Sequence, residues 1–264
     1  MRIGISTACL YPMELEKALS TLISMNFKLY EIFINTFSEF QPQYLKMIAG
    51  MLKESGSSVK SVHPFTSGFE SFLLFTEYER RFQDGLEFYK QYFNAANQLG
   101  AVILVLHGQR DDKRSKTSEK LYFEHYAKLY ELGKTFGVTV AQENVNLFRS
   151  DDPEFITRMR KYLKDCCAFV LDIKQAVRAG KNPFEMCDAM GERIVHVHLN
   201  DNDSKSDCLL PGFGCMNYKL LLEKLMSFGY AGDLILEVYR RSFHALSEIS
   251  VSKQFIDKMV SHYT

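Results

Sequence analysis

The sequence predicts a single-domain (β/α)8 barrel. Short β-rich runs alternate with longer amphipathic runs eight times along 264 residues, and an eight-unit barrel typically takes roughly 250 residues. The β-rich runs are almost continuously apolar, as in Val102-Ile103-Leu104-Val105-Leu106, which is typical of parallel strands covered on both faces. A doubly wound open sheet is the alternative, but no G-x-G-x-x-G follows the first strand. One domain over residues 1–264 is therefore the simplest interpretation.

Each unit pairs one expected strand with a following helix. In the first half we expect strands at Ile3–Thr7, Leu29–Ile34, Val59–His63 and Val102–His107, with helices at Glu14–Met25, Gln41–Ser55, Tyr78–Leu99 and Ser118–Phe136. In the second half we expect strands at Thr139–Gln142, Ala168–Leu171, Ile194–Leu199 and Leu234–Val238, with helices at Pro153–Leu163, in stretches through Met190, at Tyr218–Phe228 and at Ala245–Ser261. A glycine that can end a helix in the left-handed conformation precedes several strands, namely Gly56, Gly100, Gly137 and Gly229.

Composition argues against two classes of partner. The chain has 32 basic and 32 acidic residues, so its formal net charge of zero gives no general electrostatic grip on nucleic acid or on an anionic membrane. No apolar run approaches the roughly 20 residues of a membrane span, and the first residues read as a strand rather than a secretory signal. The six cysteines form no C-x-x-C pair and are expected to be free thiols. We therefore expect a cytoplasmic protein that binds neither nucleic acid nor membrane.

Ionisable residues end four consecutive strands, the fifth to the eighth: Glu143, Asp172, His198 and Glu237. In a barrel, the active site lies where strands run into their following loops, and adjacent strands are only about 4.8 Å apart. Burying four such groups together is costly unless they are paired or bind a metal. One of these residues alone would more often be a salt-bridge partner, but four in register predict a site. Three carboxylates and one imidazole suit one divalent ion, which could be Mn²⁺, Zn²⁺, Co²⁺ or Mg²⁺.

Two more histidines, His63 and His107, end the third and fourth strands and should face the same mouth. They could hydrogen-bond the substrate, bind a second metal, or be ordinary structural histidines. His196 shares a strand face with His198, and we expect it one layer deeper.

The loops after the second, third and fourth strands give only hints. The first two are rich in phenylalanine, which could form a lid, a subunit interface or local packing: Phe37, Phe40, Phe65, Phe69, Phe72 and Phe75. The loop at Gln109-Arg110-Asp111-Asp112-Lys113-Arg114 is expected to be solvated, although its basic residues could meet a substrate phosphate.

These segments, in this order, resemble the xylose isomerase-like barrel superfamily, which includes sugar isomerases and epimerases, inosose dehydratases and endonuclease IV. The resemblance is carried by Val62-His63-Pro64, Leu106-His107-Gly108, Gln142-Glu143-Asn144, Leu171-Asp172, His196-Val197-His198-Leu199-Asn200-Asp201, Leu210-Pro211-Gly212 and Leu236-Glu237. It implies that Glu143, Asp172, His198 and Glu237 are the metal ligands. It also implies that Glu143 and Glu237 act as catalytic acid and base, and that His63 and His107 line the pocket or bind further metal.

The chain departs from the superfamily's patterns at several positions. Gln175 replaces the histidine of the Asp-x-x-His that is common after the sixth strand, and a glutamine binds a hydroxyl better than a metal. Phe213 replaces the glutamate of Pro-Gly-Glu-Gly, and Ser204 stands where ketose epimerases commonly have an arginine. The chain also lacks the Asp-x-His of endonuclease IV. A tagatose- or psicose-type epimerase is therefore left open, and an endonuclease is disfavoured.

The favoured hypothesis is a metal-dependent isomerase or epimerase of a sugar, sugar phosphate or related hydroxy-ketone, acting through an enediolate. The residues expected to bind substrate are His63, His107, Gln175 and Asp201, and Asp201 could instead orient a metal ligand. An inosose-type dehydratase on the same scaffold is one alternative. A non-catalytic metal- or ligand-binding barrel is another, and an apurinic-site endonuclease is the least favoured. A homo-oligomer is common among similar proteins and is left open.

Overall fold

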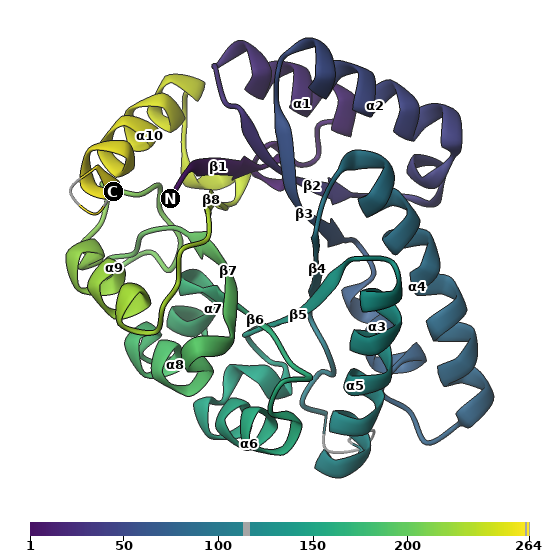
Figure 1. Cartoon of the computed structure of the whole chain (residues 1–264). Helices are drawn as coiled ribbons and strands as arrows, with labels where there is room; N and C mark the ends of the chain where they lie inside the picture. Colours follow the sequence, from purple (N-terminus) through teal and green to yellow (C-terminus); the bar gives the residue numbers. More distant parts are fainter. Residues whose placement is uncertain (113–116, 262, 264) are drawn as a thin grey trace.

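Eight parallel strands close into a barrel surrounded by helices (Figure 1) in a computed structural model that describes residues 1–112, 117–261 and 263. Each strand pairs with the next along the chain, and β8 returns to pair with β1. The predicted (β/α)8 fold is therefore confirmed. Lys113 and Arg114, considered above as phosphate contacts, lie outside the described residues. In the part of the chain that the structure describes, no helix has both the length and the apolar character needed to cross a membrane.

The strands are short and the helices are longer, as in the sequence pattern. The strands are β1 (Ile3–Ser6), β2 (Leu29–Ile34), β3 (Ser58–Pro64), β4 (Ile103–Leu106), β5 (Thr139–Glu143), β6 (Phe169–Asp172), β7 (Ile194–Leu199) and β8 (Leu234–Leu236). The α-helices are α1 (Leu15–Ser24), α2 (Pro42–Glu54), α3 (Ser67–Leu73), α4 (Glu79–Leu99), α5 (Glu119–Thr135), α6 (Pro153–Leu163), α7 (Ile173–Arg178), α8 (Pro183–Met190), α9 (Tyr218–Ser227) and α10 (Leu246–Val260). Short 3-10 helices lie at Thr7–Leu10, Phe37–Phe40, Arg149–Asp151, Gly191–Arg193 and Arg240–Ser242.

The core lies between the barrel wall and the outer helices. Every residue of β4 is buried, and the aromatic face of α4 presents Tyr92 and Phe93, which are fully buried. Gly100 ends α4 with a φ of 75°, the left-handed conformation predicted for it. All six cysteines are free thiols, as expected.

An ion pair closes the barrel at the seam between its first and last strands. Arg2, just before β1, donates from Nε to Asp233 Oδ1 at 3.0 Å and from Nη2 to Asp233 Oδ2 at 2.7 Å. The backbone N–H of Arg2 also donates to Asp233 Oδ1 at 3.1 Å. Burial alone would raise the pKa of Asp233, but Arg2 outweighs it and lowers that pKa. The carboxylate therefore fixes the register of β1 against β8.

Replacing Asp233 with Asn should lower the free energy of unfolding by roughly 1–2 kcal/mol, because the charge-assisted bonds to Arg2 become ordinary hydrogen bonds. Urea denaturation at neutral pH measures this loss. The matched control is Glu14→Gln, which breaks the exposed Glu14–Lys17 pair and should change the free energy of unfolding much less. Equal losses in the two variants would contradict a special role for the seam.

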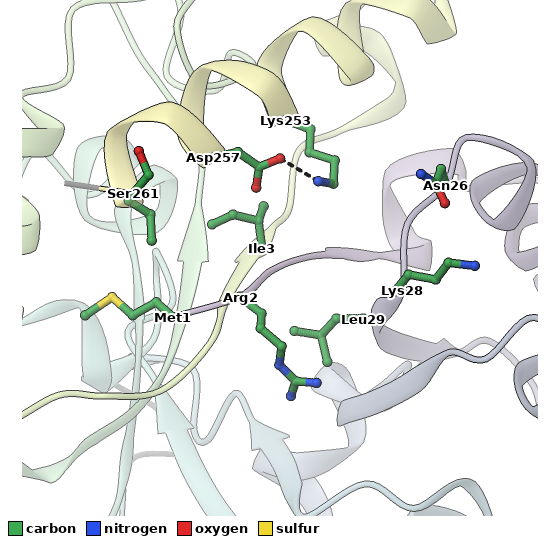
Figure 2. A pocket seen from close by; sticks show the side chains of 10 residues that line it. Met1, Arg2, Ile3, Asn26, Lys28, Leu29, Lys253, Asp257 and Ser261 are labelled. Atoms are coloured by element: carbon green, nitrogen blue, oxygen red, sulfur yellow. Dashed lines mark hydrogen bonds and ion pairs between the residues drawn. The ribbon is translucent and has the colours of Figure 1, made fainter. Parts of the chain in front are cut away.

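A hollow of about 360 Å³ lies at the amino-terminal ends of β1 and β2, against the last turns of α10 (Figure 2). Its charged side chains already have partners: Lys253 pairs with Asp257, Arg2 pairs with Asp233, and Lys28 donates to the Ser55 carbonyl. This end of a barrel serves stability, whereas chemistry is found at the opposite end.

Candidate metal centre and active site

Four strand ends bring Glu143, Asp172, His198 and Glu237 to one point. Glu143 ends β5, Asp172 ends β6, His198 lies in β7 and Glu237 directly follows β8. His198 Nδ1 lies 3.0 Å from Glu143 Oε1, 3.0 Å from Glu237 Oε2 and 3.4 Å from Asp172 Oδ2. All four side chains are buried. The structure thus brings together the four residues that the sequence singled out.

The four side chains fit a divalent metal ion. Each offers one ligand atom, and these atoms lie within 4.8 Å of one another. Three carboxylate oxygens and one imidazole nitrogen form a donor set that Mn²⁺, Zn²⁺, Co²⁺ and Mg²⁺ share. Three buried carboxylates this close together also favour a cation that offsets their repulsion and lost hydration. Further three-residue groups overlap this one, including His63, His107 and Glu143.

Lys174 is the one lysine or arginine among the described residues that forms ion pairs with this cluster. Its ammonium forms short ion pairs with Asp172 Oδ2 and Glu237 Oε2, and its side chain is only 3% exposed. Sequence reasoning missed it, because a lysine at the start of a helix ordinarily extends into solvent. Its place two residues after Asp172 was the available signal.

The buried carboxylate of Glu31, in β2, hydrogen-bonds to the ring nitrogen of His198 that faces away from the cluster. Glu31 Oε2 lies 3.0 Å from His198 Nε2, 3.0 Å from His196 Nε2 and 2.7 Å from Ser61 Oγ. A carboxylate oxygen accepts, so Nε2 of His198 donates to it and Nδ1 faces the cluster. His196 lies beneath His198 in this network, as its position in the strand predicted. Glu31 was missed, although a charged residue inside the apolar run Leu29–Ile34 was a signal.

Replacing Glu31 with Gln should weaken Mn²⁺ binding about 10–100-fold, the usual effect of removing a carboxylate that orients a ligating histidine. Calorimetric titration of the metal-free protein measures it. The control is Glu70→Gln, which alters an equally buried carboxylate that contacts His107 instead, and which should change Mn²⁺ affinity little. An unchanged affinity in Glu31→Gln would show that Glu31 does not orient His198.

The surroundings separate the pKa values of the two glutamates. Burial raises the pKa of Glu143 to about 7. Burial would also raise the pKa of Glu237, but His198 and Lys174 outweigh it and bring that pKa well below its ordinary value. The carboxylates around His198, with Glu237 foremost, overcome its burial and raise the pKa of the imidazole. Two carboxyl groups with pKa values pushed apart are the arrangement that an acid–base pair needs.

A cavity of about 230 Å³ opens beside this cluster. Five predicted site residues reach it, together with Lys174: Glu143, Glu237, His63, His107 and Gln175. The rest of its wall is mainly apolar and aromatic, formed by Ala8, Tyr11, Phe33, Pro64, Phe65, Ser67 and Tyr239. A small apolar pocket with a few convergent polar groups is the usual form of a small-molecule site.

The two predicted histidines take different electrostatic roles. His63 Nε2 lies 3.7 Å from Glu237 Oε1, and burial lowers the pKa of His63 to about 4, so the ring is neutral. His107 Nδ1 lies 3.0 Å from Glu70 Oε1, and Glu70 outweighs burial to raise the pKa of His107. Glu70 comes from α3, a helix that the sequence pattern did not predict within the phenylalanine-rich loop. The bond to Glu70 directs the other ring nitrogen of His107 away from α3.

Gln175 and Asp201 differ in where they lie. Gln175 lines the cavity, and its Oε1 accepts from the backbone N–H of Asn146 at 3.2 Å. Asp201 is not among the described residues that line the cavity. Its carboxylate accepts from the backbone N–H groups of the loop after β7, namely those of Asn202, Gly212, Gly214 and Met216. Asp201 therefore stabilises this loop. These contacts differ from the contact with substrate or with a metal ligand that its position after His198 suggested.

The phenylalanines of the two loops are divided between several environments. Phe65 lines the cavity and packs edge-to-face on Phe37 at 5.4 Å between ring centroids. Phe75 is buried and stacks on Tyr122 at 4.0 Å. Phe69 and Phe72 are each 54% exposed. Local packing therefore accounts for Phe75, while Phe65 belongs to the site wall.

The closed barrel and the buried carboxylate–imidazole cluster at its mouth define a class: a (β/α)8 barrel with a candidate metal centre at the carboxyl ends of its strands. A family model, the xylose isomerase-like TIM barrel, matches residues 20–259. The chain belongs to the xylose isomerase-like TIM barrel family, as the motifs had indicated.

Relatives and solved structures extend this finding. The uncharacterized protein ML2432 of Mycobacterium leprae is 24% identical over 273 residues, which cover 94% of this chain and 92% of the relative. A D-tagatose 3-epimerase-like protein superposes with a TM-score of 0.81 at 21% identity, covering 99% of this chain and 97% of that chain. The IolI protein, solved with a zinc atom, superposes with a TM-score of 0.79 at 16% identity, covering 100% and 99%. At these identities the structural likeness establishes the fold.

Proposed function

We propose that this chain is a divalent-metal-dependent isomerase or epimerase of a sugar or a related hydroxy-ketone. The observation that carries the proposal is that Glu143 and Glu237, two of the four converging groups, also line the cavity where a small molecule would bind. The likeness to an epimerase-like protein and to a zinc-containing protein of the same fold supports the reaction class and the need for a metal.

Glu143, Asp172, His198 and Glu237 would hold the ion. When bound, a divalent ion supplies Lewis acidity that makes the carbon beside a substrate carbonyl more acidic. Glu237 is the proposed base, because its pKa is lowered and its Oε1 lies toward His63, on the side away from Lys174. Glu143 is proposed to return the second proton, because it is the other glutamate of the cluster that lines the cavity. Return of the proton to the opposite face gives epimerisation, and return to the adjacent carbon gives isomerisation.

The other cavity residues would bind and shield the substrate. His107, held by Glu70, and Gln175 can hydrogen-bond substrate oxygens. Phe33, Phe65 and Tyr239 cover the apolar edges of a sugar and limit the entry of water to a carbanion-like intermediate. A neutral sugar fits this wall better than a sugar phosphate, because Lys174 is the one lysine or arginine among the described lining residues.

The test is a screen of free ketohexoses, inosose-type ketones and sugar phosphates with the protein loaded with Mn²⁺, Co²⁺, Zn²⁺ or Mg²⁺. Reactions are run in D₂O and followed by proton NMR. We expect deuterium to enter beside the carbonyl of a neutral ketose as its epimer or isomer appears. Loss of water from the substrate would indicate a dehydratase instead. No deuterium incorporation with any metal and any ketone would refute the proposal.

A further inference from the structure

The ammonium of Lys174 takes the same atoms that a metal ion would use. Asp172 Oδ2 and Glu237 Oε2 lie 3.4 Å and 3.0 Å from His198 Nδ1, so these two oxygens face the centre of the four-residue cluster. The Lys174 ammonium bonds to these same two oxygens. It does not sit behind the carboxylates as an outer partner would, but occupies their inner face.

Both cations cannot share this position. A divalent ion bound to Asp172 Oδ2 and Glu237 Oε2 would lie within a few ångströms of the ammonium, where two positive charges repel strongly in a buried site. Lys174 is almost fully buried, so solvent screens this repulsion little. Without a metal, however, the same ammonium offsets the mutual repulsion of three carboxylates.

We propose that Lys174 is a built-in counter-cation of the metal centre, which a divalent ion displaces when it binds and which therefore weakens metal binding. The inference deepens the proposed function and rests on its metal centre. The displaced ammonium has a place to go, because Lys174 already lines the cavity and its Nζ lies 5.8 Å from the centre of the Tyr239 ring. In the metal-loaded protein Lys174 then becomes a donor to substrate oxygens.

The experiment is calorimetric titration of Mn²⁺ into the metal-free protein without any substrate. Lys174→Met keeps the length of the side chain and removes its charge, so we expect Mn²⁺ to bind at least about tenfold more tightly. Lys174→Arg keeps the charge and should not bind Mn²⁺ more tightly than the wild type. Lys161→Met makes the same change in net charge on the exposed surface of α6 and should leave the affinity unchanged.

Several results would overturn the inference. They are unchanged or weaker Mn²⁺ binding in Lys174→Met, equal tightening in Lys174→Arg, and the absence of Mn²⁺ binding in every variant. The last result would also remove the metal from the proposed function. Unchanged affinity in Lys174→Met beside a metal-dependent epimerase activity would remove only the inference, since the titration contains no substrate.

A second measurement covers the case in which Lys174→Met does not fold. Wild-type protein labelled with ¹³C at lysine Cε is titrated with Zn²⁺ and followed by NMR. The resonance of Lys174 is identified by its absence from the spectrum of Lys174→Arg. Displacement predicts that this resonance shifts strongly as Zn²⁺ binds, while the other lysine resonances stay in place. A Lys174 resonance that Zn²⁺ leaves unmoved would refute displacement.

Discussion

Glu237→Gln should stop the exchange of the substrate's α-proton with solvent, lowering its rate by at least about 100-fold, the lower end of what a general base contributes. Glu237 combines the two properties that the base needs. Its neighbours, with His198 foremost, hold its pKa below the ordinary value against the effect of burial, and its side chain reaches the cavity. Glutamine keeps the shape of the side chain but cannot take a proton. Deuterium incorporation measured by NMR, at metal concentrations that saturate the variant, gives the rate.

Glu143→Gln complements this variant, because it tests the return of the proton rather than its removal. If Glu237 removes the proton and Glu143 delivers the second one, Glu143→Gln should still exchange the α-proton while epimer formation stops. The two variants then separate proton removal from proton return, although both alter a group of the same metal cluster. Retained exchange in Glu237→Gln would exclude Glu237 as the base. Lost exchange in Glu143→Gln alone would reverse the two assignments.

The fold and the strand-end cluster could be predicted because both depend on local sequence. The β-rich runs Leu29–Ile34 and Ile194–Leu199 have the predicted bounds, since most of their residues are apolar, as in strands covered on both faces. Barrel closure then brings the residues that end neighbouring strands to one mouth. Glu143, Asp172, His198 and Glu237 follow from this rule, although they lie far apart in the sequence.

The residues that surround the cluster could not be predicted, because their roles arise from tertiary contacts. Glu70 reaches His107 across 37 positions, and Glu31 reaches His198 across 167. Lys174 acts on Glu237, 63 residues away. Asp201 shows the opposite case, because its motif suggested a site contact. In the structure, backbone N–H groups of the loop after β7 donate hydrogen bonds to its carboxylate. A sequence motif can therefore predict that a residue lies at a strand end, but the groups that its side chain contacts depend on the conformation of the loops.

The amount of bound metal per chain should depend on the four-residue cluster. We expect about one divalent ion per chain in the wild type by elemental analysis. In Glu143→Ala, metal binding should be weakened more than about 100-fold, beyond the loss typical for a residue that only orients a ligand, because one of four ligating groups is removed.

The apparent Mn²⁺ affinity of the wild type should also rise with pH. Glu143, with a pKa raised to about 7, and His198, whose pKa is also raised, each bind a proton that the metal must displace.

Asp233→Asn is the control for metal content, since it alters a carboxylate at the far end of the barrel and should keep the ion. The stoichiometry then separates the remaining hypotheses. Three ions per chain would favour endonuclease chemistry and would draw on the second group formed by His63, His107 and Glu143. No ion, even after addition of Mn²⁺ or Zn²⁺, would favour a non-catalytic barrel, in which Lys174 is the permanent counter-cation of the buried carboxylates. One ion, lost from Glu143→Ala and kept in Asp233→Asn, is the result that a single-metal isomerase requires, because its acid and base are also its ligands.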